Sequence, residues 1–209
     1  MSIKFIFVSD GSSDRTLVYV LRWICRERFQ RTIEGDWFDP RPYGPPTLSL
    51  RESIIRSLKL FECDILFVHR DAESEDPETR FNEINEAASC LAGKDHCPPL
   101  ICVVPVRMTE AWLLFDERAI RQAASNPNGA KKLDLPSIHK LERVPDPKRV
   151  LFKAIQEASG LNGRRLKKLR LGRCRLRVAE LISDFSPLRS LSAFNRLETS
   201  INDLKLNGF

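Results

Sequence analysis

The chain lacks the segments that would place it in a membrane or in an oxidising compartment. None of its apolar runs approaches the roughly 20 residues that a helix needs to cross a bilayer, and it begins directly with a strand-like segment. Its six cysteines form no C-x-x-C pair and no regular framework, so we expect reduced and mostly buried thiols. His96, Cys97 and Cys102 offer only half of a zinc site. These absences predict a cytoplasmic protein.

The common catalytic signatures are missing as well. The sequence contains no Ser-His-Asp order, no signature of a nucleophilic cysteine, no dinucleotide fingerprint and no phosphate-cradling P-loop. It also has no internal repeat and no low-complexity tract. With 209 residues, of which 42% are hydrophobic and 30% charged, the chain can build a hydrophobic core in one large domain, or in one domain with an appendage.

Short apolar segments alternate with amphipathic ones in the first half of the chain. Strand-like segments occupy residues 3–9, 64–68 and 100–106, with a weaker candidate around Trp37 and Phe38. Helical spacing fills the intervals, which predicts an α/β domain over residues 1–116, with a parallel sheet covered by helices on both faces. After about residue 117 no strand pattern appears, so we expect a helical C-terminal region over residues 117–209.

Acidic residues stand where three of these strands should end. Asp10 and Asp14 follow the first strand, Asp71 and Glu73 follow the second, and Glu110 follows the third. The C-terminal ends of parallel strands lie along one edge of a sheet, where ligands bind. Carboxylates gathered there repel each other unless a cation neutralises them. A hard divalent metal takes oxygen ligands, so this edge is a candidate metal site.

Some of these residues also have a structural explanation. Asp14 can cap the helix that follows the first strand, and we favour that role for it. Glu110 suits the first turn of a helix, where its charge complements the helix dipole. Asp10 is not needed as a cap, and Gly11 beside it allows the backbone to approach a ligand closely. Asp10 is therefore the stronger ligand candidate of the first pair.

The run from His69 to Glu73 is the densest group of ionisable residues after any predicted strand. If the chain stays extended, His69, Asp71 and Glu73 point to the same side. A charged surface loop is the alternative, and the acidic residues just beyond fit it well. We favour Asp71 and Glu73 as ligands, while His69 is open between a ligand, a general base and a buried, hydrogen-bonded residue.

A basic block lies in the C-terminal half. Residues 164–177 hold eight basic residues and no acidic one, and without them the net charge of +6 becomes −2. Such a block forms a solvated helix face, meets an acidic partner protein, or contacts a phosphate backbone with strong salt dependence. The candidate phosphate contacts are Arg107, Arg164, Arg165, Lys167, Lys168, Arg170 and Arg173.

The acidic edge and the basic block together predict metal-assisted phosphoryl transfer. One or two Mg²⁺ ions, or Mn²⁺ ions in their place, would polarise a phosphodiester and activate water. The basic appendage would hold a nucleic-acid backbone.

Several motifs resemble those of the Toprim fold. Residues 8–14 (Val-Ser-Asp-Gly-Ser-Ser-Asp) resemble its first motif, in which a strand ends in a Glu-Gly pair and an acidic residue opens the next helix. Asp71-Ala72-Glu73 is similar to its second motif, the Asp-x-Asp pair. Residues 67–73 and 104–114 resemble small Toprim-like bacterial proteins of poorly characterised families, often encoded beside an ATPase. The resemblance covers roughly residues 1–116.

This resemblance implies a nuclease that acts as the effector of an anti-phage defence system, assembled with the ATPase or with copies of itself. It implies Mg²⁺ at Asp10, Asp71 and Glu73, with Glu110 assisting and Asp10 also handling protons. Two departures from the family are visible. Asp10 stands where the family has glutamate, and Glu73 stands where it has the second aspartate.

Two other functions are compatible with the same residues. One is a non-catalytic module whose acidic edge and basic appendage bind proteins and hold an ATPase inactive. The other is an accessory protein similar to those of topoisomerases or primases, although the chain lacks room for a tyrosine-bearing cleavage domain.

Overall fold

The computed structural model describes residues 2–9, 11–39, 48–73, 75–91 and 97–204. Contacts divide the chain into two compact units. The first, called here the sheet unit, comprises Met1–Val104 and Arg196–Phe209, and the second, the helical unit, is Pro105–Asn195. These bounds differ from the predicted 1–116 and 117–209. Within the described residues, no helix has the length and apolar character needed to span a bilayer.

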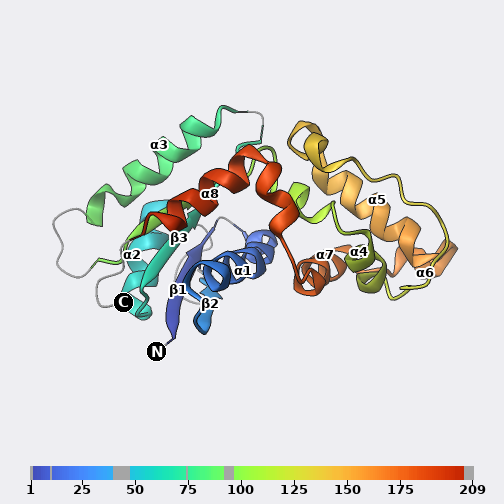
Figure 1. Cartoon of the computed structure of the whole chain (residues 1–209), viewed down its shortest axis with the longest axis horizontal. Coiled ribbons are helices and arrows are strands. Elements are labelled where there is room, and N and C mark those ends of the chain that lie inside the picture. The colour runs from blue at the N-terminus through green and yellow to red at the C-terminus, as the bar shows by residue number, and fades with distance from the viewer. Residues whose placement is uncertain (1, 10, 40–47, 74, 92–96, 205–209) are drawn as a thin grey trace. The chain divides into compact units, whose positions relative to one another are not determined.

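The sheet unit is built on a four-stranded, entirely parallel sheet with the order β2-β1-β3-β4 (Figure 1). The strands are β1 (Ile3–Val8), β2 (Ile33–Trp37), β3 (Ile65–His69) and β4 (Leu100–Val103). The predicted parallel α/β fold is thus confirmed. The last strand is shorter than the predicted 100–106, because Pro105 has no N–H with which to continue the ladder.

Helices and 3-10 turns connect these strands. In the sheet unit they are η1 (Ser12–Thr16), α1 (Leu17–Phe29), α2 (Leu50–Leu60), α3 (Pro77–Ala88) and η3 (Ser89–Leu91), and α8 (Ser192–Asn202) joins this unit from Arg196 onward. The C-terminal end of α8 is held by Arg28, which donates to the carbonyl oxygen of Asn202. Near the middle of α8, Arg196 stacks over the ring of Phe81 in α3, 3.5 Å from its centroid. The chain therefore returns to the sheet unit, and this return accounts for its second segment.

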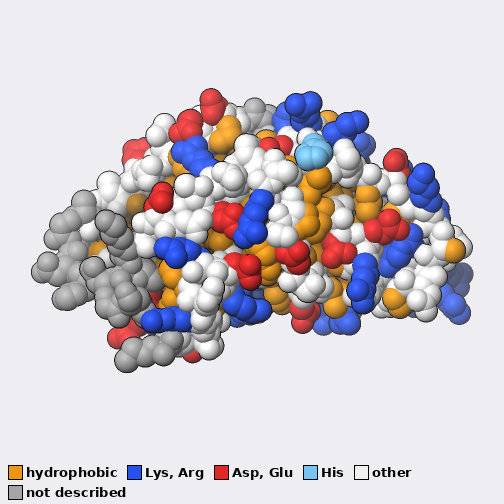
Figure 2. Space-filling model, in the orientation of Figure 1, with side chains coloured by type: hydrophobic (Ala, Val, Ile, Leu, Met, Phe, Trp, Pro, Cys, Tyr) orange, Lys and Arg blue, Asp and Glu red, His pale blue; other side chains and the backbone are white. Residues whose placement is uncertain are grey.

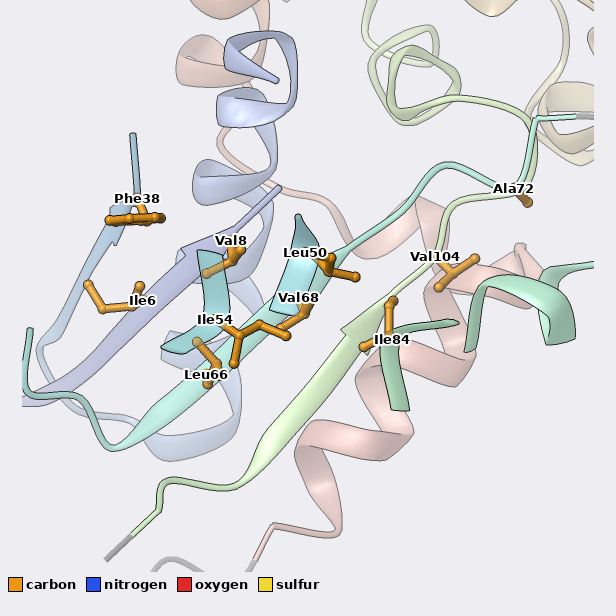
Figure 3. Packing of buried hydrophobic residues seen from close by; sticks show 10 residues of the cluster. All are labelled: Ile6, Val8, Phe38, Leu50, Ile54, Leu66, Val68, Ala72, Ile84 and Val104. Atoms are coloured by element: carbon orange, nitrogen blue, oxygen red, sulfur yellow. The ribbon is translucent and has the colours of Figure 1, made fainter. Parts of the chain in front are cut away.

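The alternation of side chains along the strands produces two apolar layers. One face of β1 and β3 packs against α2 and α3, and Figure 3 shows ten side chains of this cluster. They are Ile6, Val8, Phe38, Leu50, Ile54, Leu66, Val68, Ala72, Ile84 and Val104. The alternate residues of β1 and β3 belong to the opposite face. There, Phe5 and Phe67 pack edge to face, with ring centroids 5.1 Å apart.

Gly35 makes the second layer possible. It pairs with Phe5 across β1 and β2, and the Phe5 ring lies directly on its Cα. A Cβ at this position would stand 2.1 Å from Phe5 Cζ. Any larger residue must therefore displace a buried aromatic ring.

The helical unit contains no strand among its residues, as predicted for the C-terminal region. Its elements are η4 (Thr109–Leu113), α4 (Glu117–Ala123), η5 (Ile138–Arg143), α5 (Pro147–Ser159), α6 (Gly163–Lys167), α7 (Leu171–Leu181) and η6 (Ser186–Ser190). Its core includes an edge-to-face contact between Trp112 and Phe194, 5.4 Å between centroids. Asp146 caps α5 by accepting from the Arg149 N–H, and Pro147 occupies its first turn. An aspartate directly before a proline is a typical helix start, and the sequence has this pair here.

Substituting Gly35 by alanine should lower the free energy of unfolding by about 1–3 kcal/mol, the usual cost of overpacking a core. Urea denaturation measures this change. Gly172→Ala is the matched control, because a Cβ at this helical glycine meets no atom within 4 Å. The control should be neutral or slightly stabilising. Equal stability of Gly35→Ala and wild type would show that the Phe5 ring is not held against Gly35.

Candidate functional site

The strand order defines where a ligand would bind. The chain passes from β1 outward to β2, and later from β3 outward to β4, so the direction of winding reverses between β1 and β3. In open parallel sheets the crevice lies at the C-terminal ends of the two strands that flank this reversal. Pairing of Val8 with Val68 brings those two ends side by side. Residues just beyond Val8 and Val68 are therefore the candidates for a site.

The structure brings Asp14, His69 and Asp71 together at this place. One ligand atom of each residue lies within 4.8 Å of the others. Asp14 belongs to η1, which follows β1, whereas His69 ends β3 and Asp71 follows it. The side chains are largely enclosed, with exposed fractions of 11% for Asp14, 2% for His69 and 20% for Asp71. Such burial makes uncompensated carboxylate charge costly.

The orientation of the His69 ring is set by a backbone contact. Its Nδ1 lies 2.8 Å from the carbonyl oxygen of Val103 on the neighbouring strand β4. A carbonyl oxygen only accepts hydrogen bonds, so Nδ1 carries the hydrogen. In the neutral ring, Nε2 then presents a lone pair. Metal-binding histidines commonly have this arrangement, in which the other ring nitrogen donates to a carbonyl or a carboxylate.

The lone pair of Nε2 faces two carboxylates. Nε2 lies 3.5 Å from Asp71 Oδ1 and 3.9 Å from Asp14 Oδ2. With a neutral ring, all three facing atoms are acceptors, so either a proton on Nε2 or a cation among them must offset their repulsion. Adjacent ligands held about 2.1 Å from one octahedral ion are about 3.0 Å apart, somewhat closer than these atoms lie. The types of donor, two carboxylate oxygens and an imidazole nitrogen, suit a divalent metal ion, so the group could hold one.

Asp14 is fixed by the turn that the sequence predicts at this point. Its Oδ2 accepts from the Gly11 N–H at 3.3 Å, and its Oδ1 accepts from Ser13 Oγ at 2.9 Å. Asp14 is thus not the N-cap of η1, which is Gly11, but the third residue of its first turn, whose carboxylate bonds back to the Gly11 N–H. The same carboxylate also reaches His69. From the sequence, a local structural role is sufficient to explain Asp14, and it is not among the predicted ligands. Its place in the first turn after β1 was the signal that could have kept it as a ligand candidate.

Asp71 is positioned through its backbone. Arg80 in α3 donates from Nε to the carbonyl oxygen of Asp71 at 3.1 Å, and its guanidinium also pairs with Glu83 at 2.7 Å. Ala72, next in the chain, is buried in the apolar cluster (Figure 3). These contacts hold the segment after β3 against the sheet, which limits the freedom of the Asp71 side chain.

The other predicted ligands have different surroundings. Asp10 lies outside the described residues. Glu73 is exposed and does not belong to the group of Asp14, His69 and Asp71. Its backbone is left-handed, with φ of 53°, a conformation that costs energy for residues other than glycine and often marks functional segments. Arg107, a predicted phosphate contact, shares this feature, with φ of 68°.

Glu110 forms a buried ion pair within the helical unit. Its Oε1 lies 2.6 Å from Arg175 Nη1, and the two side chains are only 5% and 11% exposed. Arg175 thus neutralises the carboxylate that the sequence offered as an assisting metal ligand. The pair joins η4 to α7, which explains why a glutamate can be buried after β4.

The thiols are poor candidates for ligands or nucleophiles. All six cysteines are free, as expected from the sequence. Burial raises the pKa of the Cys63 and Cys102 thiols to about 11 and that of Cys25 to about 12. Because the thiolate is the reactive and metal-binding form, these three residues are inert near neutral pH.

Asp71→Asn and His69→Gln should each weaken Mn²⁺ binding at least tenfold, because each removes one of three ligands. Electron paramagnetic resonance of unbound Mn²⁺ measures the affinity. Glu75→Gln, in the same loop but outside the group, is the control and should bind as wild type does. Equal affinities in all four proteins would eliminate the metal site.

Glu110→Ala should lower the free energy of unfolding by about 3–5 kcal/mol, because Arg175 would remain buried without a counter-charge. The double variant Glu110→Met with Arg175→Met should recover most of this loss. Chemical denaturation measures both, and Mn²⁺ affinity should not change in the double variant. A fall in affinity with stability intact would instead make Glu110 a ligand.

Comparison with known proteins adds no assignment. The chain matches no protein-family model, no curated protein and no solved structure. What the structure itself supports is a parallel α/β sheet with a buried Asp-His-Asp group that could hold a metal ion.

Proposed function

We propose that this chain is a divalent-metal-dependent nuclease that hydrolyses phosphodiesters. The observation that carries the proposal is the convergence of Asp14, His69 Nε2 and Asp71 at the reversal point of a parallel sheet. Acidic groups at this edge are the arrangement expected of a metal-dependent hydrolase. The Toprim-like motifs around residues 8–14 and 71–73 support the same chemistry.

The ligand set favours particular ions. Two carboxylates suit Mg²⁺ or Mn²⁺, and the imidazole nitrogen favours Mn²⁺ of the two, because Mg²⁺ takes oxygen ligands. When bound, such an ion polarises a phosphodiester and acidifies water, which are the two requirements for hydrolysis at neutral pH. Asp14, His69 and Asp71 would hold the ion.

The remaining residues of the site have supporting roles. The Val103 carbonyl keeps His69 Nδ1 protonated, so that Nε2 remains available to the ion. Arg80 holds the backbone at Asp71. Phe7 lies beside the His69 ring, 6.0 Å between centroids, and excludes water from that side. In this proposal Asp10 handles protons or contributes a further ligand, as the resemblance implies.

The biological setting proposed comes from the resemblance alone. We infer that the chain is the effector subunit of an anti-phage system and works with an ATPase encoded beside it. In this proposal Arg107 and the basic block contact the nucleic-acid backbone. A regulatory subunit without catalysis is the second candidate, and the engagement of Glu110 by Arg175 favours it, because one expected metal ligand is already neutralised.

Cleavage of supercoiled plasmid, single-stranded DNA and tRNA tests the proposal, with Mg²⁺ or Mn²⁺ and with or without the ATPase. Wild type should cleave at least one substrate, and Asp71→Asn should lose at least a hundredfold in rate, because it removes a metal ligand. Glu75→Gln should retain the wild-type rate.

Two results would contradict this proposal. Equal cleavage by wild type and Asp71→Asn would show that the activity does not depend on this site. Absence of cleavage under every condition, together with inhibition of the ATPase by the chain, would establish the regulatory function instead.

A further inference from the structure

Positive charge is concentrated in the helical unit. Residues 105–195 contain 19 Lys and Arg but only nine Asp and Glu, a net charge of +10, whereas the rest of the chain carries −4. Figure 2 shows basic side chains over the region of α5 and α6. A surface with this excess attracts polyanions, and the attraction depends strongly on salt.

Most of the basic block is available to a ligand. Seven of its eight cations are exposed, and none of the seven forms an ion pair with a carboxylate in the part of the chain that the structure describes. Arg175 is the exception, because it is buried with Glu110. The exposed residues are Arg164, Arg165, Lys167, Lys168, Arg170, Arg173 and Arg177.

A groove lies beside α5, next to this block. It has a volume of about 600 Å³ and is lined by three cations, Lys148, Arg149 and Lys153, by apolar Phe152 and Leu171, and by Asp146 and Gln156. Asp146 Oδ2 lies 3.8 Å from Arg149 Nε, so two of the three cations are without this acidic neighbour. Leu171 begins α7, so the groove adjoins the middle of the basic block. A second depression of about 380 Å³ shares Lys153 and also contains Lys131, which pairs there with Glu157 at 3.6 Å. None of the α5 residues was a candidate in the sequence.

We propose that this groove binds single-stranded nucleic acid, with phosphates on Lys148, Arg149 and Lys153 and a base against Phe152. Single-strand sites combine a positively charged groove with aromatic side chains on which bases stack. In a duplex the base faces are already stacked on each other, so Phe152 would have no partner. An acidic protein is the competing occupant, and the polyglutamate displacement described below distinguishes it from a nucleic-acid strand.

Single-stranded nucleic acid would be the substrate class of the proposed nuclease. The role of the groove as a substrate site therefore rests on the proposed function. Binding to the groove itself does not require the metal site. The affinity can therefore be measured in EDTA, where no hydrolysis occurs. If the wild-type chain binds single strands but hydrolyses no substrate, only the proposed function is overturned. If it hydrolyses a substrate but does not bind single strands at the groove, only this inference is overturned.

Fluorescence anisotropy of a labelled oligothymidylate with the full chain provides the test. Phe152→Ala should weaken binding roughly tenfold, the effect of losing one stacked base, without changing the salt dependence. Lys153→Gln should reduce the slope of log affinity against log salt by about 0.7, the value for one phosphate contact on a single strand. Phe152→Tyr should retain the affinity, because the ring remains.

Matched controls separate the groove from general charge. Lys59→Gln removes an exposed lysine from α2 in the sheet unit and should leave the affinity unchanged. Phe152→Leu keeps an apolar side chain but removes the ring, so it should lose affinity as Phe152→Ala does. Circular dichroism of each variant shows whether it is folded. Wild-type affinity in folded Phe152→Ala, or displacement of the strand by polyglutamate of equal charge, would overturn the inference.

Discussion

The parallel pairing of β1 with β3 is the constraint on which the candidate site depends. The two strands are separated by more than fifty residues of sequence, yet the register of Val8 with Val68 places their C-terminal ends together. Because the chain winds outward in opposite directions from these two strands, their C-terminal ends are where a crevice is expected in an open parallel sheet. Asp14 enters it from one strand end, and His69 with Asp71 from the other. A different strand order would separate them.

Two enclosed carboxylates, those of Glu110 and Asp14, have different kinds of partner. Glu110 is matched by Arg175 at 2.6 Å, which leaves a neutral, structural pair in the helical unit. Asp14 has no lysine or arginine partner among the described residues, and its Oδ2 faces an imidazole whose hydrogen is held on the opposite nitrogen. A protein that needed only stability would be expected to neutralise both in the first way, because unpaired buried charge is costly. The second arrangement is typical of a site that binds a cation.

The two units also differ in charge. The helical unit carries +10, and exposed charge acts over a distance set by screening, whereas the sheet unit carries −4 and holds its acidic group in an enclosed place. Long-range attraction needs exposed charge, and metal binding needs a few charges with fixed geometry. In the groove beside α5, the aromatic side chain of Phe152 lies next to this exposed positive charge. Nucleic-acid binding and metal-dependent chemistry can thus reside in different parts of one chain.

The sequence by itself determined the elements and the fold class. The alternation of apolar strands with amphipathic helices, the cap at Asp146 and the end of strand patterns after residue 117 are local properties, and local properties can be recognised from spacing. It also identified His69 and Asp71 as members of one acidic and histidine-containing run. The tertiary structure decided which residues of other segments join them. Asp14 has a sufficient local role in the first turn of η1, and Glu110 occupies a strand end like the others, so no pattern distinguishes the candidate ligand from the ion-pair partner. That choice depends on strand order and on the approach of Arg175 from 65 residues away, and both arise only when the chain folds.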